Sequence, residues 1–182
     1  MTKSSASARS TRPTARPAGS AGGSPLRFSL WIVFGFLILV LDQATKLWFE
    51  RRLDPGEFVS VIDGFFNLTL AHNYGAAFSF LAGMGGWQRW LLSGVAIAVA
   101  AVVLRLLWKH NGQTLFALSL TLILSGALGN LIDRTLSGYV VDFLDFYIGA
   151  WHWPAFNVAD IAICMGAAGI VLDELRGVSK GR

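Results

Sequence analysis

Long apolar segments alternate with shorter polar stretches along the chain. Four of these segments approach the roughly 20 residues that a helix needs to cross a bilayer, and they span residues 28–48, 87–108, 114–132 and 156–175. Tryptophan residues stand near the proposed ends, as is typical of side chains at a membrane–water interface. They are Trp31, Trp48, Trp87, Trp90 and Trp108. The pattern predicts an all-α integral membrane protein with four transmembrane helices.

The composition supports this interpretation, because 54% of the 182 residues are hydrophobic and only 14% are charged. A soluble domain is about a quarter charged, so little room is left for a separate soluble domain. The net charge of +4 is compatible with nucleic-acid binding, but the basic residues are spread along the chain. Their densest group precedes the first apolar segment, which membrane orientation explains better. We therefore expect no nucleic-acid partner.

The distribution of lysine and arginine predicts the orientation in the membrane. Five of them lie in the first 27 residues, two near the connection between the second and third segments, and three at the C-terminus. The opposite side receives four: Arg51, Arg52, Arg89 and Arg134. This excess places both termini in the cytoplasm. Residues 1–25 are then a disordered basic cytoplasmic tail, residues 26–176 the membrane domain, and residues 177–182 a cytoplasmic C-terminal tail.

The two connections on the outer side are the long ones. Residues 50–86 contain "EFVSVI" and "FFNLTLAH", which favour β-strands and are divided by the turn signal "DG". We expect a small extracytoplasmic β-rich cap there, lying on the outer membrane surface. Residues 133–155 form the other outer loop, and their "YVVDFLDFYIG" is too apolar for a free loop. This loop is expected to pack at the interface.

Metal and thiol chemistry have little support in the sequence. The single cysteine, Cys164, lies inside an apolar run, cannot form an internal disulfide and is expected to be a small buried side chain. The three histidines, His72, His110 and His152, are far apart and form no HExxH motif.

The first apolar segment carries two charges within "DQATK". Asp42 and Lys46 are four residues apart, so they lie on one face of a helix and can pair. Two interpretations remain open: a structural ion pair that fixes helix packing, or contact with a polar headgroup or backbone of a substrate.

Two further motifs place polar groups on the same side of the membrane. "HNYGAAF" brings Asn73 next to Gly75, Ala76 and Ala77, where small residues let another backbone approach and the amide can bond a peptide group. A simple turn would also use Asn and Gly. "GNLIDR" closes the third segment with Asn130, Asp133 and Arg134, which are either interfacial residues at a helix end or part of a site.

The last polar groups are acids in apolar surroundings. "VVDFLDF" contains Asp142 and Asp145, and "FNVAD" brings Asn157 and Asp160 into the start of the fourth segment. If the outer loop folds onto that helix, Asp142 and Asp160 can meet. Two close carboxylates share a proton, so one can act as a base toward water while the other polarises a carbonyl. Ion pairing or a proton path would also use two such acids.

These motifs together resemble the prolipoprotein signal peptidase family, the type II signal peptidases of bacteria. The resemblance runs in order through "DQATK", "FFNLTLAHNYGAAFSFL", "GALGNLIDR", "VVDFLDFY" and "FNVADIAI", over roughly residues 40–165. It implies an intramembrane aspartyl endopeptidase of the bacterial inner membrane, with no metal or organic cofactor. Such an enzyme removes the signal peptide from a diacylglyceryl-modified prolipoprotein, cutting before the lipidated cysteine. We expect membrane lipid as its surroundings and a monomer as its active form.

Carried over by motif, the resemblance makes Asp142 and Asp160 the catalytic pair, near the outer face of the membrane. It implies that Asn73, Gly75, Asn130, Arg134 and Asn157 shape and support the site, and that Asp42 and Lys46 brace it from the first helix. Structural roles are favoured for Asp133 and Asp145. The long Arg-rich N-terminal tail departs from the compact form of the family.

Two other classes of protein fit parts of the pattern. A small four-span proton-coupled transporter would use Asp160 or Asp42 as its membrane carboxylate, but it needs no second acid and no long outer loops. A noncatalytic membrane scaffold would tolerate neutral substitutions at both acids. A thiol oxidoreductase is excluded, because one cysteine cannot cycle an internal disulfide.

Overall fold

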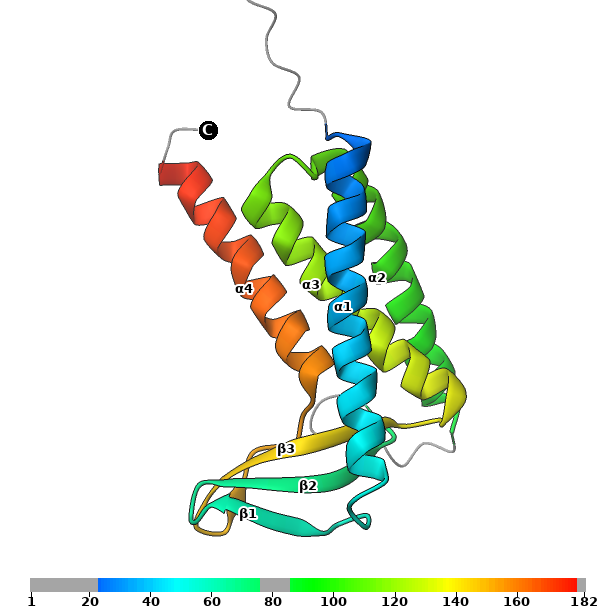
Figure 1. Cartoon of the computed structure of the whole chain (residues 1–182), viewed down its shortest axis with the longest axis vertical. Helices are drawn as coiled ribbons and strands as arrows, with labels where there is room; N and C mark the ends of the chain where they lie inside the picture. The colour runs from blue at the N-terminus through cyan, green and yellow to red at the C-terminus, as the bar shows by residue number, and fades with distance from the viewer. Residues whose placement is uncertain (1–22, 76–85, 180–182) are drawn as a thin grey trace, which may run out of the picture.

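The structure is a computed structural model that describes residues 23–75 and 86–179. Most of the predicted basic tail lies outside the described residues, as do Ala76, Ala77 and residues 180–182. Within the described ranges, four helices run alongside one another with a small sheet at one end (Figure 1). The helices are α1 (Pro25–Glu50), α2 (Gln88–His110), α3 (Thr114–Leu136) and α4 (Val158–Ser179).

All four predicted apolar segments are helical, and each helix continues past the C-terminal end predicted for it. Among the described residues, α1, α2 and α3 are long and apolar enough to cross a membrane. The fourth helix is also long, but it carries Asp160 near its start and Asp173, Glu174 and Arg176 near its end. Its uncharged stretch therefore covers only residues 161–172.

The third helix is central in the bundle, because it packs against α1, α2 and α4. Glycines permit its close contact with α4: a Cβ added at Gly126 would collide with the Ala159 carbonyl oxygen, and one at Gly166 would lie 2.6 Å from the Ser119 carbonyl oxygen. Leu107 and Leu120 form the centre of the apolar core between α2 and α3. Exact packing along α3 thus holds the start of α4 in place.

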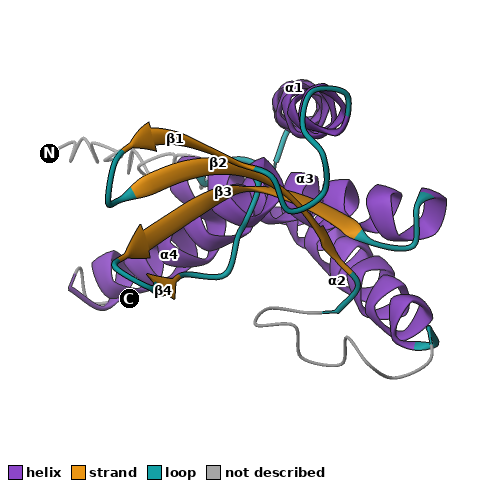
Figure 2. Ribbon diagram, turned by 90° about the horizontal axis from the view of Figure 1, so that it is seen from below, coloured by secondary structure: helices purple, strands orange, loops and turns teal. Residues whose placement is uncertain are grey.

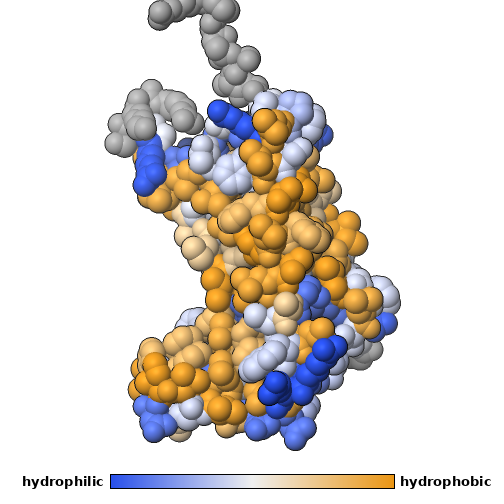
Figure 3. Space-filling model, in the orientation of Figure 1, coloured by the Kyte–Doolittle hydropathy of each residue, from blue (hydrophilic) through white to orange (hydrophobic). Residues whose placement is uncertain are grey.

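Hydrophobic side chains cover most of the visible face of the helices, and hydrophilic residues gather toward the two ends (Figure 3). Large apolar residues of α1, including Leu30, Phe36 and Leu37, are exposed by 60% or more. A helix with an apolar outer surface is the expected arrangement in lipid.

The sheet is antiparallel with the strand order β1-β2-β3-β4. Its strands are β1 (Phe58–Ile62), β2 (Phe66–Asn73), β3 (Val140–Ile148) and β4 (Trp151–His152). Figure 2 shows the strands crossing in front of α3 and α4, with α1 seen end-on beside them. The two β-favouring stretches predicted on either side of "DG" are strands and form the β1–β2 hairpin. Gly64 occupies its turn with a φ of 81°, which glycine adopts without strain.

Residues 133–155, expected to be an outer loop that packs at the interface, contain regular secondary structure. Residues 133–136 complete α3, and most of the remainder forms β3 and β4. The first four residues of β3 are all buried, so its sequence shows no alternation of apolar and polar positions. A register shift lies between Leu68 and Ala71: Leu68 pairs with Leu144, but Ala71 pairs with Asp142. This bulge sets which residues of β2 face Asp142.

Candidate active site

The candidate site lies where β2 and β3 meet the beginning of α4. Asn73 ends β2, Asp142 lies near the start of β3, and Asn130 lies in the C-terminal part of α3. Asn157 immediately precedes α4, and Asp160 lies in its first turn. The structure therefore brings together five of the residues that the sequence motifs indicate.

Asn157 caps α4 and joins the two carboxylates. Its side-chain oxygen accepts a hydrogen bond from the Asp160 backbone N–H (3.0 Å), and its own backbone N–H donates to Asp160 Oδ2 (3.3 Å). This reciprocal arrangement is a capping box, which satisfies two N–H groups at the start of a helix. The amide nitrogen of Asn157 donates to Asp142 Oδ1 (2.7 Å). One fully buried side chain thus contacts the peptide unit of Asp160 and the carboxylate of Asp142.

Asp142 is buried, with 3% of its surface exposed, and its second oxygen accepts a hydrogen bond from Asn73 Nδ2 (3.0 Å). Burial raises the pKa of Asp142 from its ordinary value of 3.8 to about 7, and the negative charge of Asp160 adds to the rise. The hydrogen bonds from Asn73 and Asn157 act in the opposite direction. A carboxyl with this pKa carries a proton for much of the time at neutral pH.

Asp160 is partly exposed and accepts a hydrogen bond from Asn130 Nδ2 (2.8 Å). Both acids line one cavity of about 620 Å³. Apolar residues of α4, among them Ile161, Ile163 and Met165, line another part of this cavity. The cavity therefore combines two carboxyl groups with an apolar wall. We call it the catalytic cavity, after the function proposed below for its two acids.

The predicted pairing of Asp42 with Lys46 is confirmed, at 2.9 Å. Lys46 also pairs with Asp133 (2.8 Å) and donates to Asn130 Oδ1 (3.0 Å). Asp42 accepts a hydrogen bond from the backbone N–H of Ala159 (2.9 Å) at the start of α4. Because Asp42 is fully buried and Lys46 is 3% exposed, the structure favours a structural ion pair over contact with a substrate headgroup. We call Asp42, Lys46 and Asp133 the ion cluster.

Sequence reasoning missed Gln43, although it stands within the quoted "DQATK". Its amide nitrogen donates to Asp133 Oδ1 (2.9 Å) and to the Gly129 carbonyl oxygen (3.3 Å). Gln43 therefore ties the ion cluster to the backbone of α3. Its position beside Asp42 was the available signal.

Arg134 binds carbonyl oxygens near the site. It donates to the carbonyl oxygens of Gly75 (3.3 Å) and Asn130 (3.4 Å). The backbone N–H of Gly75 in turn donates to Asn73 Oδ1 (3.0 Å), which fixes the orientation of the Asn73 amide toward Asp142. Arg134 and Gly75 thus support the site through Asn73 and Asn130.

Two further sequence expectations concern residues near the catalytic cavity. Asp145 does not line it and instead bonds Asn67 and His152, which agrees with a structural role. Cys164 was expected to be buried, but it is exposed and lines the catalytic cavity. An apolar helix can expose any of its faces to lipid, so position in an apolar run does not indicate burial. Within the described ranges there is no cluster of three potential metal ligands among His, Cys, Asp and Glu.

The fold and the site together define a membrane protein that holds two acids at the wall of an apolar cavity. Comparison with known proteins gives the family. The model of the family described as signal peptidase (SPase) II matches residues 34–176. The chain belongs to this family, whose members are proteases of bacterial membranes.

Curated relatives cover nearly the whole chain. The lipoprotein signal peptidase of Cupriavidus taiwanensis is 51% identical over 177 residues, which is 97% of this chain and 98% of the relative. The lipoprotein signal peptidase of Cupriavidus necator is 52% identical over 176 residues, again 97% and 98%. That of Ralstonia nicotianae is 51% identical over 165 residues, covering 91% and 95%.

Solved structures share the fold. One, described as a bacterial membrane enzyme studied by the in meso method at 2.3 Å resolution, has a TM-score of 0.76 and 29% identity. The match covers 85% of this chain and 92% of that one. A second, at 1.9 Å, has a TM-score of 0.72 and 28% identity and covers 81% and 93%.

Proposed function

We propose that this protein is an intramembrane aspartyl endopeptidase that removes the signal peptide from diacylglyceryl-modified prolipoproteins, cutting before the lipidated cysteine. The observation that carries the proposal is the linkage of Asp142 and Asp160 through Asn157 at the wall of one cavity. The names of the close relatives, lipoprotein signal peptidases, support the substrate class.

In this mechanism the two acids share one proton. The ionised carboxylate takes a proton from water while the water oxygen attacks the scissile carbonyl carbon, and the protonated carboxyl gives its proton to the carbonyl oxygen. The resulting tetrahedral diol then returns one hydroxyl proton to a carboxylate, while the other carboxyl protonates the amide nitrogen. The C–N bond breaks, and the pair again holds one proton. The raised pKa of Asp142, about 7, supports a proton held at neutral pH.

The amide side chains have a defined part in this scheme. Asn73, Asn130 and Asn157 donate to the carboxyl oxygens, so they hold the two acids in place without neutralising either of them. A positive charge bonded directly to either acid would favour the ionised form and oppose proton sharing. Arg134 is bonded to carbonyl oxygens instead. We assign these four residues, with Gly75, to support of the pair.

The surroundings suit a substrate that is itself embedded in lipid. Ile161, Ile163 and Met165 give the catalytic cavity an apolar wall along α4, which can accept the hydrocarbon of a signal peptide or of a diacylglyceryl group. The proposal includes a fourth membrane crossing by α4, with Asp160 near the outer interface. It also includes cytoplasmic termini, the sheet on the outer surface and action as a monomer. The first residues of α1 and the last of α4 both lie at the end of the bundle opposite the sheet, as this orientation requires (Figure 1).

The test is cleavage of a diacylglyceryl-modified prolipoprotein, followed by gel shift, with purified wild type, Asp142→Asn and Asp160→Asn. Each substitution removes the carboxylate and nearly preserves the volume, so we expect a loss of at least about 1000-fold in rate. Each variant is also compared with wild type in its thermal transition in detergent, to show that it is folded.

The outcomes separate the possibilities. Loss of cleavage in two folded variants supports the shared-proton pair. Cleavage near the wild-type rate by either variant shows that the substituted acid is not catalytic. An inert wild type would favour the proton-coupled transporter.

A further inference from the structure

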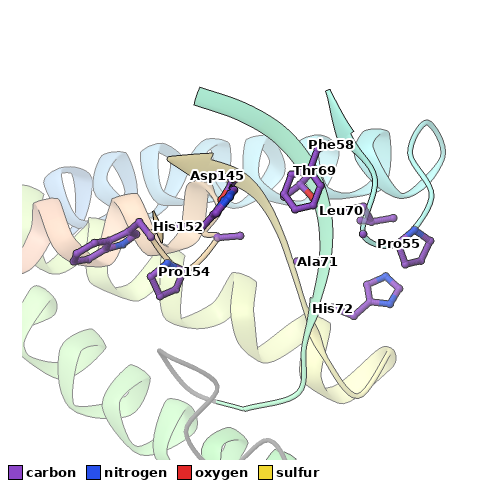
Figure 4. Close-up of a pocket in the computed structure, with 12 residues that line it drawn as sticks. Pro55, Phe58, Thr69, Leu70, Ala71, His72, Asp145, His152 and Pro154 are labelled. Atoms are coloured by element: carbon purple, nitrogen blue, oxygen red, sulfur yellow. Dashed lines mark hydrogen bonds and ion pairs between the residues drawn. The ribbon is translucent and has the colours of Figure 1, made fainter. Parts of the chain in front are cut away.

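A second cavity, of about 540 Å³, lies on the sheet (Figure 4). The two cavities share five lining residues: Ala71, His72, Trp153, Pro154 and Ala155. The second cavity does not include the apolar residues of α4 and is lined instead by Phe58, Thr69, Asp145 and His152 of the strands. We call it the sheet cavity. It is a continuation of the catalytic cavity onto the sheet.

The sheet cavity contains an oriented imidazole. His152 Nδ1 lies 2.9 Å from both carboxylate oxygens of Asp145, and Asp145 also accepts a hydrogen bond from Asn67 Nδ2 (3.0 Å). A carboxylate only accepts hydrogen bonds, so Nδ1 carries the hydrogen. The ring also stacks on Tyr147, with centroids 5.0 Å apart. These contacts fix the ring and its tautomer.

The other ring nitrogen remains available for a ligand. Nε2 of His152 has no hydrogen-bond partner among the described residues, and 42% of the side chain is exposed. In the tautomer set by Asp145, Nε2 accepts a hydrogen bond. A buried carboxylate that orients an exposed imidazole next to a catalytic cavity is an arrangement suited to binding a polar N–H group.

The location of the sheet cavity indicates which part of the substrate would occupy it. The catalytic cavity extends in one direction along α4, beside Ile161 and Met165, and in the other direction onto the sheet. The sheet stands at the end of the bundle, beyond most of the helical length (Figure 1). An apolar signal peptide or acyl chain fits the wall along α4. A polar polypeptide leaving the membrane fits the strands.

We propose that the sheet cavity binds the polypeptide that follows the scissile bond, the first residues of the mature lipoprotein, in an extended conformation. His152 Nε2 accepts a hydrogen bond from an N–H group of that segment, with Asp145 as the residue that orients it. This inference rests on the proposed function and adds a binding site for the mature side of the substrate. Extended peptides commonly bind along strands with their N–H groups bonded and their side chains in adjoining pockets.

The experiment uses two synthetic diacylglyceryl lipopeptides with the same signal sequence. The long one continues for ten residues after the lipidated cysteine, and the short one ends at that cysteine as an amide. The variants are His152→Asn and His152→Gln. Asparagine places its NH₂ near the position of Nδ1 and keeps the bond to Asp145, whereas glutamine reaches the position of Nε2. His110→Phe, which replaces a histidine outside both cavities, is the control.

We expect His152→Asn to lower kcat/KM for the long substrate by about fivefold, the value of one ordinary hydrogen bond, and to leave the short substrate unchanged. His152→Gln should retain most of the wild-type value on the long substrate. An equal loss on both substrates would overturn the proposal, because His152 would then act on the shared site geometry. No loss on either would also overturn it. If the wild type cuts neither peptide, the proposed function itself fails, which is a different result from cutting both without a role for His152.

Discussion

Two pairs of carboxylates belong to one hydrogen-bonded network, and they differ in what holds them. Asp42 and Asp133 share the ammonium of Lys46, with contacts of 2.9 and 2.8 Å. Asp142 and Asp160 form no ion pair with a described residue, and their side chains accept hydrogen bonds from amide groups. The first pair therefore shares a cation, whereas the carboxyl groups of the second pair are bonded to neutral amide groups.

Asn130 connects the ion cluster with the pair formed by Asp142 and Asp160. Its oxygen accepts from Lys46 (3.0 Å) and its nitrogen donates to Asp160 (2.8 Å). An ammonium only donates hydrogen bonds, so Lys46 fixes which end of the Asn130 amide faces Asp160. The buried ammonium of Lys46 thus orients the amide that binds Asp160, without contacting Asp160 itself. Three substitutions or pH changes should distinguish the structural role of the ion cluster from the role of Asp142 and Asp160; the largest expected effect comes first.

Replacing Lys46 with methionine should break the ion cluster. The apolar stem is preserved, but two buried carboxylates lose their shared cation, which we expect to lower the free energy of unfolding by about 3–5 kcal/mol. The measurement is the thermal transition of the purified protein in detergent. Lys109→Met, which removes an exposed lysine, is the matched control and should change stability by less than about 0.5 kcal/mol. Equal effects of the two substitutions would contradict a structural role for the cluster.

The substitution Gly126→Ala, which adds a methyl group, should separate α3 from α4. The new Cβ would meet the Ala159 carbonyl oxygen, so α3 and α4 must move apart, at a cost of about 1–3 kcal/mol in stability. Cleavage should also fall, because Asp160 moves with α4. Gly94→Ala is the control, since a Cβ there meets no atom within 4 Å. A Gly126→Ala protein as stable and active as Gly94→Ala would show that the contact is not tight.

Stability should depend on pH through Asp142. Its pKa in the folded protein, about 7, exceeds the ordinary value of 3.8. Between about pH 4 and 7 the folded state therefore holds a proton that the unfolded state has released, and stability falls as the pH rises through this window. From pH 5 to 7 we expect a loss of at most about 2 kcal/mol in wild type. Thermal transitions of wild type and Asp142→Asn at pH 5, 6 and 7 measure it, and parallel curves for the two proteins would exclude the effect.

Much of the fold could be predicted, because its helices and its first turn are determined by short sequence patterns. The apolar segments gave the helices, and "DG" between β-favouring stretches gave the turn of the β1–β2 hairpin. The third strand could not be predicted in this way. Its first residues are buried on both faces, and its partner β2 lies more than 60 residues earlier in the chain. Pairing over such a distance leaves no periodic pattern in the sequence.

The sequence motifs indicated which residues belong to the candidate site, but most of the contacts between these residues could not be predicted. The spacing of Asp42 and Lys46 on one helix face identified their ion pair, since four residues make about one turn. The addition of Asp133, Gln43 and Asn130 to that pair depends on how α1 packs against α3. The pairing of Asp145 with His152 also depends on β4, a strand of two residues. Such contacts between different helices and strands can be identified only from the tertiary structure.

The hydrogen bond from Ala159 to Asp42 joins residues that are 117 positions apart. Its consequence concerns biogenesis. During synthesis the first helix emerges with Asp42 long before the segment that carries Asp160 has been made, so the nascent chain does not yet contain both Asp142 and Asp160. Under the proposed function, the chain becomes active only after its last helix has been inserted.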